Sequence, residues 1–269
     1  MLRPEAQNLP ADAQGKLSRF LTRLACAPSR ALLLDYDGTI APFCVERDRA
    51  VPYPDVLELL ERVRSVTGTR LVLVTGRRAA DAAQLLGLKR VEVWGCHGLE
   101  RIHVDGSCEL VTLDPATLQT MATVDELLIR HGLSSLVEYK PAAAAIHWRG
   151  LEPDAARDVM LKVQSVWSQL PDTRGLRLLK FDGGMEIRTA ARNKGDVVRS
   201  IVSELGKGAS IAYLGDDLTD EDAFAALQGY GLSILVRSDY RPTVADIWLR
   251  PPEEILEFLS DWVNTCGGA

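Results

Sequence analysis

Short apolar runs that end in acidic, glycine or threonine residues alternate with helical patterns over much of the chain, and this alternation limits the possible folds. Residues 31–36 form one such run, and residues 71–74 form a second. Between them, apolar residues recur every three or four positions from Val56 to Val66, the spacing of an amphipathic helix. Continuous apolar runs suit parallel strands that are buried on both faces. Strands alternating with helices therefore predict an α/β fold with a doubly wound parallel sheet.

The pattern changes in the middle of the chain. Asp105-Gly106 separates two short segments and predicts a hairpin, and further short strands and two helices follow it. After residue 188 the alternation of helices and strands resumes. The sequence thus predicts a Rossmann-like core that is interrupted by a smaller α+β domain. The predicted limits are residues 1–28 for an N-terminal extension, 29–100 and 188–269 for the core, and 101–187 for the inserted domain.

Composition narrows the classes of function. The chain has 269 residues with a net charge of −6, which argues against a general nucleic-acid-binding surface. No apolar run approaches the roughly 20 residues that cross a bilayer. Residues 20–26 are too short and too interrupted for a signal sequence, so we expect a cytoplasmic protein. The five cysteines form no CxxC pair, which argues against a zinc site or a disulfide framework.

Acidic residues follow two of the predicted strands. Asp35 and Asp37 end the first strand, and Asp216, Asp217 and Asp220 follow a strand near the other end of the chain. Ligands of open α/β sheets bind at the carboxyl ends of strands. Carboxylates gathered there repel one another unless a cation lies between them, and Mg²⁺ prefers oxygen ligands. We therefore predict that these five aspartates form a Mg²⁺ site, in which Asp217 is either a ligand or a residue that orients the ligands.

Phosphoryl transfer is the chemistry that this arrangement favours. A carboxylate can attack phosphorus and give an aspartyl phosphate that water then hydrolyses. Asp35 is the predicted nucleophile. Asp37 lies two residues further on and is predicted to protonate the leaving oxygen and later to deprotonate water.

A phosphate-binding loop is predicted after the second strand. Thr75, Gly76 and Arg77 would hold phosphate oxygens there, and Lys194 would neutralise their charge. Structural alternatives to these roles remain at this point. Thr75 can be only the N-cap of the helix that starts near Arg77, and Lys194 can be a solvated lysine in the first turn of its helix. Thr219 can likewise be only a helix cap.

Four segments resemble the motifs of the haloacid dehalogenase (HAD) superfamily of phosphatases. They are Asp35-Tyr36-Asp37-Gly38-Thr39, Thr75-Gly76-Arg77, Asn193-Lys194-Gly195 and Gly215-Asp216-Asp217-Leu218-Thr219-Asp220. Longer stretches are similar to trehalose-6-phosphate phosphatases, namely residues 34–42, 74–77, 95–98 and 213–224. The resemblance extends over about residues 31–250. It implies a core with a mobile cap, a requirement for Mg²⁺, and release of phosphate from trehalose 6-phosphate.

The resemblance also implies a sugar-binding set in the inserted domain. By motif match this set is Glu138, Lys140, His147, Arg149 and Glu186. Charged donors and acceptors suit a disaccharide, because each correctly placed hydroxyl group can form a hydrogen bond with one of them. The alternative is that these residues only form the polar outer face of alternating strands.

The chain departs from the family pattern at two positions. The family usually has a lysine where this chain has Gly183, and a proline where it has Thr189. The missing lysine leaves the chemistry intact and puts the preferred sugar in question, and Lys180 is a candidate replacement. His97 belongs to a family motif in which an orienting role is as plausible as contact with a ligand.

We therefore expect a monomeric phosphoric monoester hydrolase that binds a small sugar phosphate and has no nucleic-acid or membrane partner. One alternative is the same chemistry on another sugar phosphate, of the sucrose or mannosylglycerate type. Another is a non-catalytic phospho-acceptor module, as in receiver domains. Asp37 and the inserted domain argue against the module, because a receiver needs neither a leaving-group acid nor a lid.

Overall fold

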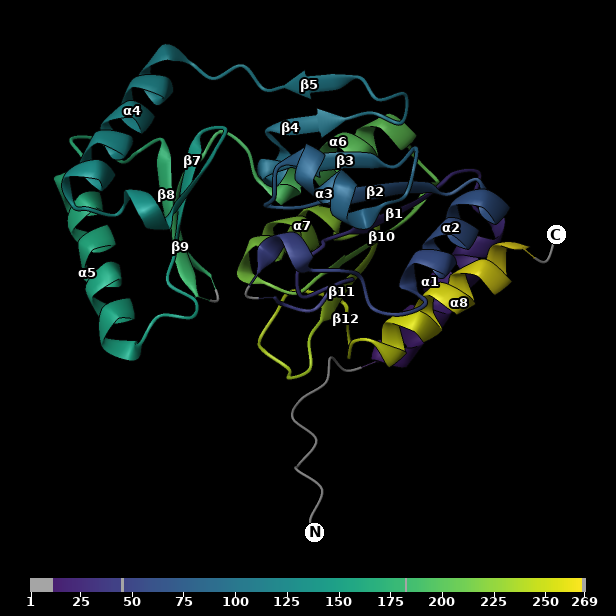
Figure 1. Cartoon of the computed structure of the whole chain (residues 1–269). Helices are drawn as coiled ribbons and strands as arrows, with labels where there is room; N and C mark the ends of the chain where they lie inside the picture. Colours follow the sequence, from purple (N-terminus) through teal and green to yellow (C-terminus); the bar gives the residue numbers. More distant parts are fainter. Residues whose placement is uncertain (1–11, 45, 182, 268–269) are drawn as a thin grey trace, which may run out of the picture. The chain divides into compact units, whose positions relative to one another are not determined.

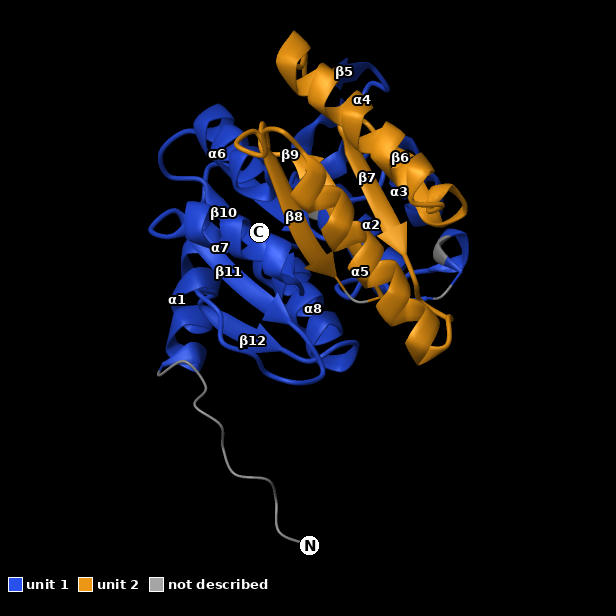
Figure 2. Cartoon of the chain, turned by 90° about the vertical axis from the view of Figure 1, so that its left-hand side faces the viewer, with its two compact units in different colours: residues 1–109, 193–269 blue, residues 110–192 orange. Residues whose placement is uncertain are grey.

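The computed structural model of the chain describes residues 12–44, 46–181 and 183–267. It divides the chain into two compact units (Figure 2). Unit 1 comprises residues 1–109 and 193–269, and unit 2 comprises residues 110–192. Unit 2 is thus inserted between two sequence segments of unit 1.

Unit 1 is built on an eight-stranded sheet in the order β12-β11-β10-β1-β2-β3-β4-β5 (Figure 1). Its strands are β1 (Arg30–Leu34), β2 (Arg70–Val74), β3 (Glu92–Gly95), β4 (Glu100–Ile102), β5 (Cys108–Leu110), β10 (Ser210–Gly215), β11 (Gly231–Val236) and β12 (Ile247–Leu249). The strands from β12 to β3 pair in parallel, and β4 pairs with β3 in antiparallel fashion. The carboxyl ends of the six parallel strands therefore meet at one edge of the sheet.

Helices cover both faces of this sheet. They are α1 (Ala13–Cys26), α2 (Val56–Thr67), α3 (Ala79–Leu86), α6 (Lys194–Leu205), α7 (Glu221–Leu227) and α8 (Glu253–Gly267), with short 3₁₀ turns η1 (Arg47–Arg49), η2 (Cys96–Gly98) and η4 (Leu218–Asp220). Leu32 and Leu34 of β1 pack with residues of α1, α2, α3 and α8. Ala31 and Leu33 pack with residues of α6 and α7. Both faces of β1 are thus buried, which explains its continuous apolar sequence.

The first helix belongs to the core layer and not to a separate extension. Phe20 and Leu24 of α1 are buried, and the Phe20 ring lies 5.7 Å from the Trp262 ring of α8. The amphipathic pattern of α1 thus buries its apolar side against the core. The predicted extension over residues 1–28 is corrected to this extent, and residues 1–11 lie outside the described part of the chain.

The limits of the inserted segment also differ from the predicted residues 101 and 187. Strand β4 pairs with β3 in the register Gly95↔Glu100 and Val93↔Ile102, so the following residues to Glu109 group with unit 1. At the other end, strand β9 continues to Thr189, so residues 188–192 group with unit 2. Both shifts arise from strand pairing between segments that are distant in sequence. That unit 2 serves as a substrate-specificity cap stays a prediction.

Unit 2 is a four-stranded antiparallel sheet in the order β6-β7-β9-β8, and two helices pack on one of its faces (Figure 2). Its elements are α4 (Pro115–Arg130), η3 (Ser134–Leu136), β6 (Val137–Lys140), β7 (Ala143–His147), α5 (Pro153–Gln169), β8 (Leu176–Phe181) and β9 (Gly184–Thr189). Ile146, Met185 and Ile187 point from the sheet into the cluster formed with α4 and α5. Residues at alternate positions therefore lie on the opposite face of the sheet.

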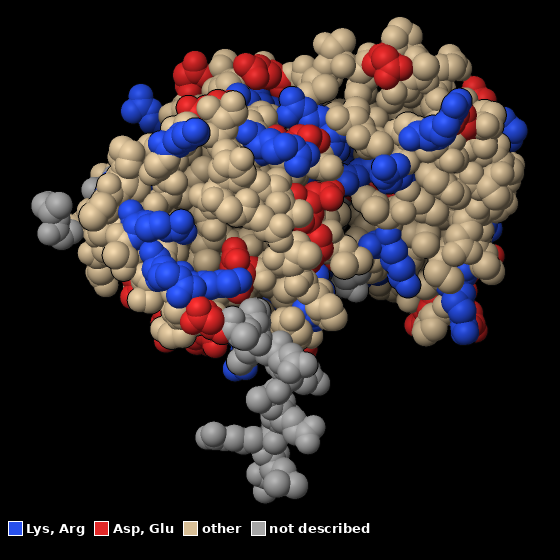
Figure 3. All heavy atoms as spheres, turned by 180° about the vertical axis from the view of Figure 1, so that it is seen from behind, with Lys and Arg blue, Asp and Glu red and all other residues tan. Residues whose placement is uncertain are grey.

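The surface carries charges of both signs. On the face drawn in Figure 3, Lys and Arg side chains form short clusters that have Asp and Glu side chains beside them. Neighbouring side chains of opposite charge partly cancel each other's electric field. Physiological salt screens what remains beyond roughly 8 Å. In the described part of the chain, no helix is both long enough and apolar enough to span a bilayer.

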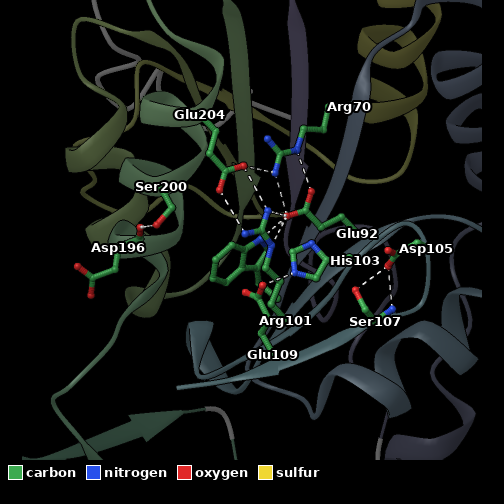
Figure 4. A network of polar contacts seen from close by, with 11 residues as sticks. Arg70, Glu92, Arg101, His103, Asp105, Ser107, Glu109, Asp196, Ser200 and Glu204 are labelled. Carbon is green, nitrogen blue, oxygen red and sulfur yellow. Dashed lines mark hydrogen bonds and ion pairs between the residues drawn. The ribbon is translucent and has the colours of Figure 1, made fainter. Parts of the chain in front are cut away.

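A buried carboxylate joins three strands and a helix (Figure 4). It belongs to Glu92, the first residue of β3, and so lies at the amino ends of the parallel strands, whereas the acidic motifs follow their carboxyl ends. Glu92 is 3% exposed and accepts hydrogen bonds from Arg70 Nε at 2.8 Å, Arg101 Nε at 2.9 Å and Trp94 Nε1 at 2.8 Å. Both arginines also contact Glu204 of α6. The cluster thus fixes β4 to β2, β3 and α6.

We expect Glu92→Ala to lower the free energy of unfolding by about 3 kcal/mol, because it leaves two partly buried guanidinium groups without their shared carboxylate. Urea denaturation followed by circular dichroism measures this loss. The matched control is Glu46→Gln, whose partner Arg49 is also on the surface, and we expect its effect to stay below about 0.5 kcal/mol. Equal losses in the two variants would contradict a structural role for the cluster.

Candidate active site

Asp35 and Asp216 lie side by side at the carboxyl ends of neighbouring strands. Strand β1 pairs with β10 in the register Leu34↔Leu214, and the Asp35 N–H donates to Leu214 O at 2.9 Å. Carboxylate oxygens of Asp35, Asp216 and Asp220 all lie within 4.8 Å of one another, and all three residues are buried. The predicted convergence of Asp35 and Asp216 is therefore present in the structure.

Gly38 lets the loop after β1 approach Asp216. It has a φ of +79°, and a Cβ at this position would lie 2.3 Å from Asp216 Oδ2. No side chain could be accommodated there without moving the carboxylate. The glycine of the first motif is thus required by the close contact between the two acidic strand ends.

Lys194 is the cation of this cluster. It is the first residue of α6, whose N-terminus is fixed by a reciprocal capping box between Asn193 and Asp196. Its Nζ lies 2.9 Å from Asp35 Oδ1 and 2.8 Å from Asp220 Oδ1, and the residue is 2% exposed. The structure therefore excludes the alternative of a solvated lysine.

Asp220 is held by four donors. Its Oδ1 accepts from Lys194 Nζ and from Tyr213 Oη at 2.6 Å, and its Oδ2 accepts from the N–H groups of Asp216 at 3.2 Å and Asp217 at 3.0 Å. Asp220 thus orients both the lysine and the loop after β10. Sequence reasoning missed Tyr213, although a tyrosine in an otherwise apolar buried strand directly before an acidic motif is a usable signal.

Asp216 differs from Asp220 in having no donor. Both of its carboxylate oxygens are buried without a hydrogen-bond partner among the described residues. The nearest cationic group is Arg237, whose Nη1 lies 4.0 Å from Asp216 Oδ2. Buried carboxylates rarely stay unpaired, so this oxygen pair fits a divalent cation that would be shared with Asp35.

The electrostatics of the cluster support the same interpretation. Burial raises the pKa of Asp35 to about 7, with Lys194 opposing the shift and Asp220 and Asp37 adding to it. Burial and the neighbouring carboxylates also raise the pKa of Asp216 well above its usual value. Burial lowers the pKa of Lys194, but Asp220 and Asp35 more than reverse this effect, so the lysine stays charged. A further positive charge would favour the ionised carboxylates.

Asp37 lies outside the three-carboxylate cluster and is paired with Arg77. Arg77 Nε lies 2.6 Å from Asp37 Oδ2, and Nη2 lies 2.5 Å from Asp37 Oδ1. The guanidinium also lies over the Tyr36 ring, 5.4 Å from its centroid. Two residues predicted for separate roles, Asp37 as acid and Arg77 as phosphate ligand, therefore contact each other. Asp37 is not among the three carboxylates of the described residues that could share an ion, so its metal role stays a prediction.

Asp217 caps the turn that follows β10. It is the N-cap of η4 and forms a reciprocal capping box with Asp220, the last residue of η4: the side chain of each accepts the backbone N–H of the other. Asp217 is not one of the three carboxylates that could share an ion among the described residues. Of the two predicted roles, the structure supports the orienting one. The cap of this turn is Asp217, and Thr219 lies inside the turn.

The loop after β2 packs against His97. The Thr75 hydroxyl accepts the N–H of Arg77 at 3.2 Å, and Thr75 O accepts the N–H of His97 at 2.9 Å. A Cβ on Gly76 would lie 2.7 Å from His97 Nε2, so only glycine fits beside the imidazole. Helix α3 begins at Ala79 with Arg78 as its N-cap, so the alternative that Thr75 caps it is wrong.

Four of the five predicted sugar-binding residues form two pairs on one face of the unit 2 sheet. Lys140 Nζ lies 2.9 Å from Glu186 Oε1, and His147 Nε2 lies 2.9 Å from Glu138 Oε2. The register Glu138↔Ala145↔Glu186 places the two glutamates in one row across the sheet. This face lies opposite the helices, because Ile146 and Met185 point toward them.

Arg149 follows β7 and occupies the space beside Gly183. A Cβ on Gly183 would lie 2.8 Å from Arg149 Cβ, and Gly183 has a φ of +77°. A longer side chain at position 183 would thus displace Arg149. This arrangement gives a physical reason for glycine at the position where the family usually has lysine.

Lys180 does not replace the missing lysine. The register Lys180↔Met185 places it on the face that packs against α4 and α5, whereas Glu186 lies on the other face. The register instead places Phe181 and Arg188 on the face of Glu186, and the Phe181 ring lies 5.3 Å from the His147 ring. Sequence reasoning missed both, although counting two residues from Glu186 would have found Arg188.

The chain matches the family model described as trehalose-phosphatase over residues 33–247. The chain belongs to this family. It is 29% identical to a trehalose-phosphate phosphatase of Mycobacterium marinum over 255 residues, which cover 89% of the chain and 64% of that relative. It is 27% identical to trehalose 6-phosphate phosphatase RA3 of Zea mays, which covers 93% of the chain and 75% of that protein.

Solved structures support the fold. The C-terminal domain of the Candida albicans trehalose-6-phosphate phosphatase matches with a TM-score of 0.80 at 21% identity, covering 97% of this chain and 99% of that one. A haloacid dehalogenase-like hydrolase from Bacteroides thetaiotaomicron matches with a TM-score of 0.65 at 13% identity, covering 86% and 98%. The predicted α/β core with an inserted α+β segment is thus confirmed at the level of the fold.

The raised pKa of Asp35 makes stability depend on pH in the metal-free protein. Its folded value of about 7 exceeds the usual 3.8, so the unfolded chain releases this proton at a lower pH than the folded chain. The contribution of Asp35 to stability is therefore lost as pH rises from about 4 to about 7. We expect the free energy of unfolding of the wild type, minus that of Asp35→Asn, to fall by on the order of a few kcal/mol over this range.

Urea denaturation in the presence of a chelator measures this difference at each pH. Because the asparagine does not titrate, subtraction removes the contributions of groups that behave alike in both proteins. A difference that stays constant or grows between pH 4 and pH 7 would show that Asp35 is not held in a protonated state by burial.

Proposed function

We propose that the chain is a Mg²⁺-dependent phosphatase that hydrolyses trehalose 6-phosphate through an aspartyl phosphate on Asp35. The observation that carries this proposal is the buried cluster of Asp35, Asp216 and Lys194, in which no described residue donates a hydrogen bond to the Asp216 carboxylate. Family membership supports the reaction class, because the relatives are named as trehalose-phosphate phosphatases. The chain spans 64% of the length of the Mycobacterium marinum relative. Its activity on trehalose 6-phosphate is therefore a proposal.

The residues of the cluster divide the chemistry between them. A carboxylate oxygen of Asp35 forms a bond to phosphorus while the bond from phosphorus to the sugar oxygen breaks. Lys194 holds Asp35 in place through Oδ1 and offsets charge on the phosphoryl group. Asp35 and Asp216 would hold Mg²⁺, with Asp220 within reach, and the ion would offset repulsion between the carboxylate and the phosphate.

Asp37 and Arg77 supply the acid and part of the phosphate cradle. Asp37 protonates the departing sugar oxygen and then removes a proton from the water that attacks the aspartyl phosphate. Its pairing with Arg77 must loosen for this to happen. A phosphate dianion near Thr75 and Gly76 would compete with Asp37 for the guanidinium, since Arg binds phosphate and carboxylate in the same forked geometry.

Unit 2 is proposed to bind the sugar through Glu138, Lys140, His147, Arg149 and Glu186. Its charged pairs can exchange partners with sugar hydroxyls, and a site built this way rejects sugars that lack them. We further propose that the protein acts as a cytoplasmic monomer on a small sugar phosphate, without nucleic-acid or membrane partners, as its net charge of −6 and its reduced cysteines suggest.

A second candidate substrate is another sugar phosphate, of the sucrose-phosphate or mannosylglycerate-phosphate type. The observation that favours it is the glycine at position 183, together with Lys180 on the opposite face of the sheet. A panel of sugar phosphates assayed with Mg²⁺ separates the two candidates. Turnover confined to a sugar other than trehalose would establish the second.

We expect Asp35→Asn to lower phosphate release from trehalose 6-phosphate by at least about 10³-fold, because the amide cannot attack phosphorus. Release is measured with Mg²⁺ and with a chelator, which should abolish it in the wild type. Asp239→Asn is the matched control, since Asp239 is an exposed residue of unit 1. Full turnover by Asp35→Asn would overturn the mechanism.

We expect Glu186→Gln to raise the KM for trehalose 6-phosphate by about tenfold, since it removes a charged hydrogen-bond acceptor worth roughly 1.5–3 kcal/mol. Turnover of a small aryl phosphate, which offers no sugar hydroxyls, should change little. Steady-state kinetics on both substrates gives the comparison. Equal losses on the two substrates would place Glu186 outside sugar recognition.

A further inference from the structure

The loop between β11 and β12 carries an arginine that contacts the acidic loop after β10. Arg241 Nη2 donates to Asp217 O at 2.8 Å and to Asp216 O at 3.3 Å, and its Nε lies 3.4 Å from Asp216 O. One guanidinium thus bridges two successive peptide carbonyls. The chemistry proposed above assigns no role to this side chain.

Arg241 is itself fixed in position. Its Nη1 pairs with Glu221 Oε1 and donates to Pro242 O at 3.0 Å. The Glu221 carboxylate also accepts from Thr243 Oγ1 at 2.8 Å and from the N–H of Val244 at 2.9 Å. The first residue of α7 therefore holds both the arginine and the loop that carries it.

The two peptide groups are held from both sides. Asp220 Oδ2 accepts the N–H groups of Asp216 and Asp217, and Arg241 binds their carbonyl oxygens. The backbone donors and acceptors of these residues are therefore satisfied by contacts away from the Asp216 carboxylate. That carboxylate accepts no hydrogen bond from the part of the chain that the structure describes, and one of its oxygens lies within 4.8 Å of an Asp35 carboxylate oxygen.

We propose that Arg241 is a positioning residue for the divalent cation, which holds the Asp216–Asp217 backbone so that the Asp216 carboxylate stays directed at Asp35. This inference rests on the proposed function, because it takes the cluster to be a Mg²⁺ site. Groups that orient metal ligands typically account for 10- to 100-fold in metal affinity. Without Arg241, the loop must become ordered when the ion binds, and affinity falls.

Arg237 provides a matched control on the neighbouring strand end. Its Nη1 lies 4.0 Å from Asp216 Oδ2, and it makes one longer contact of 3.4 Å with Asp216 O. Its positive charge faces the carboxylate that would bind the ion, so it opposes the ion. Loss of Arg237 should leave Mg²⁺ affinity unchanged or raise it a few-fold, whereas loss of Arg241 should lower it.

The test is calorimetric titration of Mg²⁺ into the wild type, Arg241→Met, Arg241→Lys and Arg237→Gln, with circular dichroism as a check on folding. We expect the Kd for Mg²⁺ to rise at least about tenfold in Arg241→Met. Arg241→Lys keeps the charge but has only one donor nitrogen, so its Kd should lie between those of the wild type and Arg241→Met. It provides the test if the methionine variant does not fold. In phosphatase assays, the rate lost at low Mg²⁺ should be recovered by raising its concentration.

Two results would overturn the inference. One is a folded Arg241→Met protein whose Kd stays within about twofold of the wild type. The other is an equal loss of affinity in Arg237→Gln, which would point to general charge effects and not to the carbonyl contacts. Both differ from a failure of the proposed function, in which the wild type itself would bind no Mg²⁺.

Discussion

Three buried carboxylates lie close together at the carboxyl end of the central sheet, two of them in contact with one lysine, and the rest of the site is arranged around their mutual repulsion. Lys194 contacts Asp35 and Asp220, while Asp216 has no hydrogen-bond donor among the described residues. Such a group is stable only if protons or a cation offset the excess negative charge. The raised pKa values of Asp35 and Asp216 reflect this constraint in the protein alone. In the proposed mechanism a divalent ion would satisfy this constraint and leave an oxygen of Asp35 able to attack phosphorus.

The fold creates this cluster from segments that are far apart in sequence. Parallel pairing of β1 with β10 places Asp35 beside Asp216, although unit 2 and much of unit 1 lie between them along the chain. The turn η4 brings Asp220 to the same place, and Lys194, at the capped N-terminus of α6, contacts Asp35 and Asp220. Each functional group thus lies at the end of a regular element, where backbone geometry fixes its direction.

Features encoded by local patterns were predictable from the sequence, and those set by long-range contacts were not. The acidic strand ends, Gly38 and Lys194 belong to short sequence motifs. Which residues meet in the buried cluster could therefore be predicted. The pairing of Arg77 with Asp37 could not, because it depends on how two separate loops approach each other. The face on which Lys180 lies depends on strand register, and a shift of one residue reverses it. The boundary between unit 1 and unit 2 near residue 109 depends on the pairing of β4 with β3.

The most direct test is a crystal structure of the protein with Mg²⁺ and beryllium fluoride, which mimics a phosphoryl group on a carboxylate. We expect beryllium bonded to a carboxylate oxygen of Asp35, Mg²⁺ between Asp35 and Asp216, and Lys194 still in contact with Asp35. Beryllium fluoride bound to a different residue, or Mg²⁺ bound away from both aspartates, would contradict the claim that these strand ends form one metal-assisted phosphoryl-transfer site.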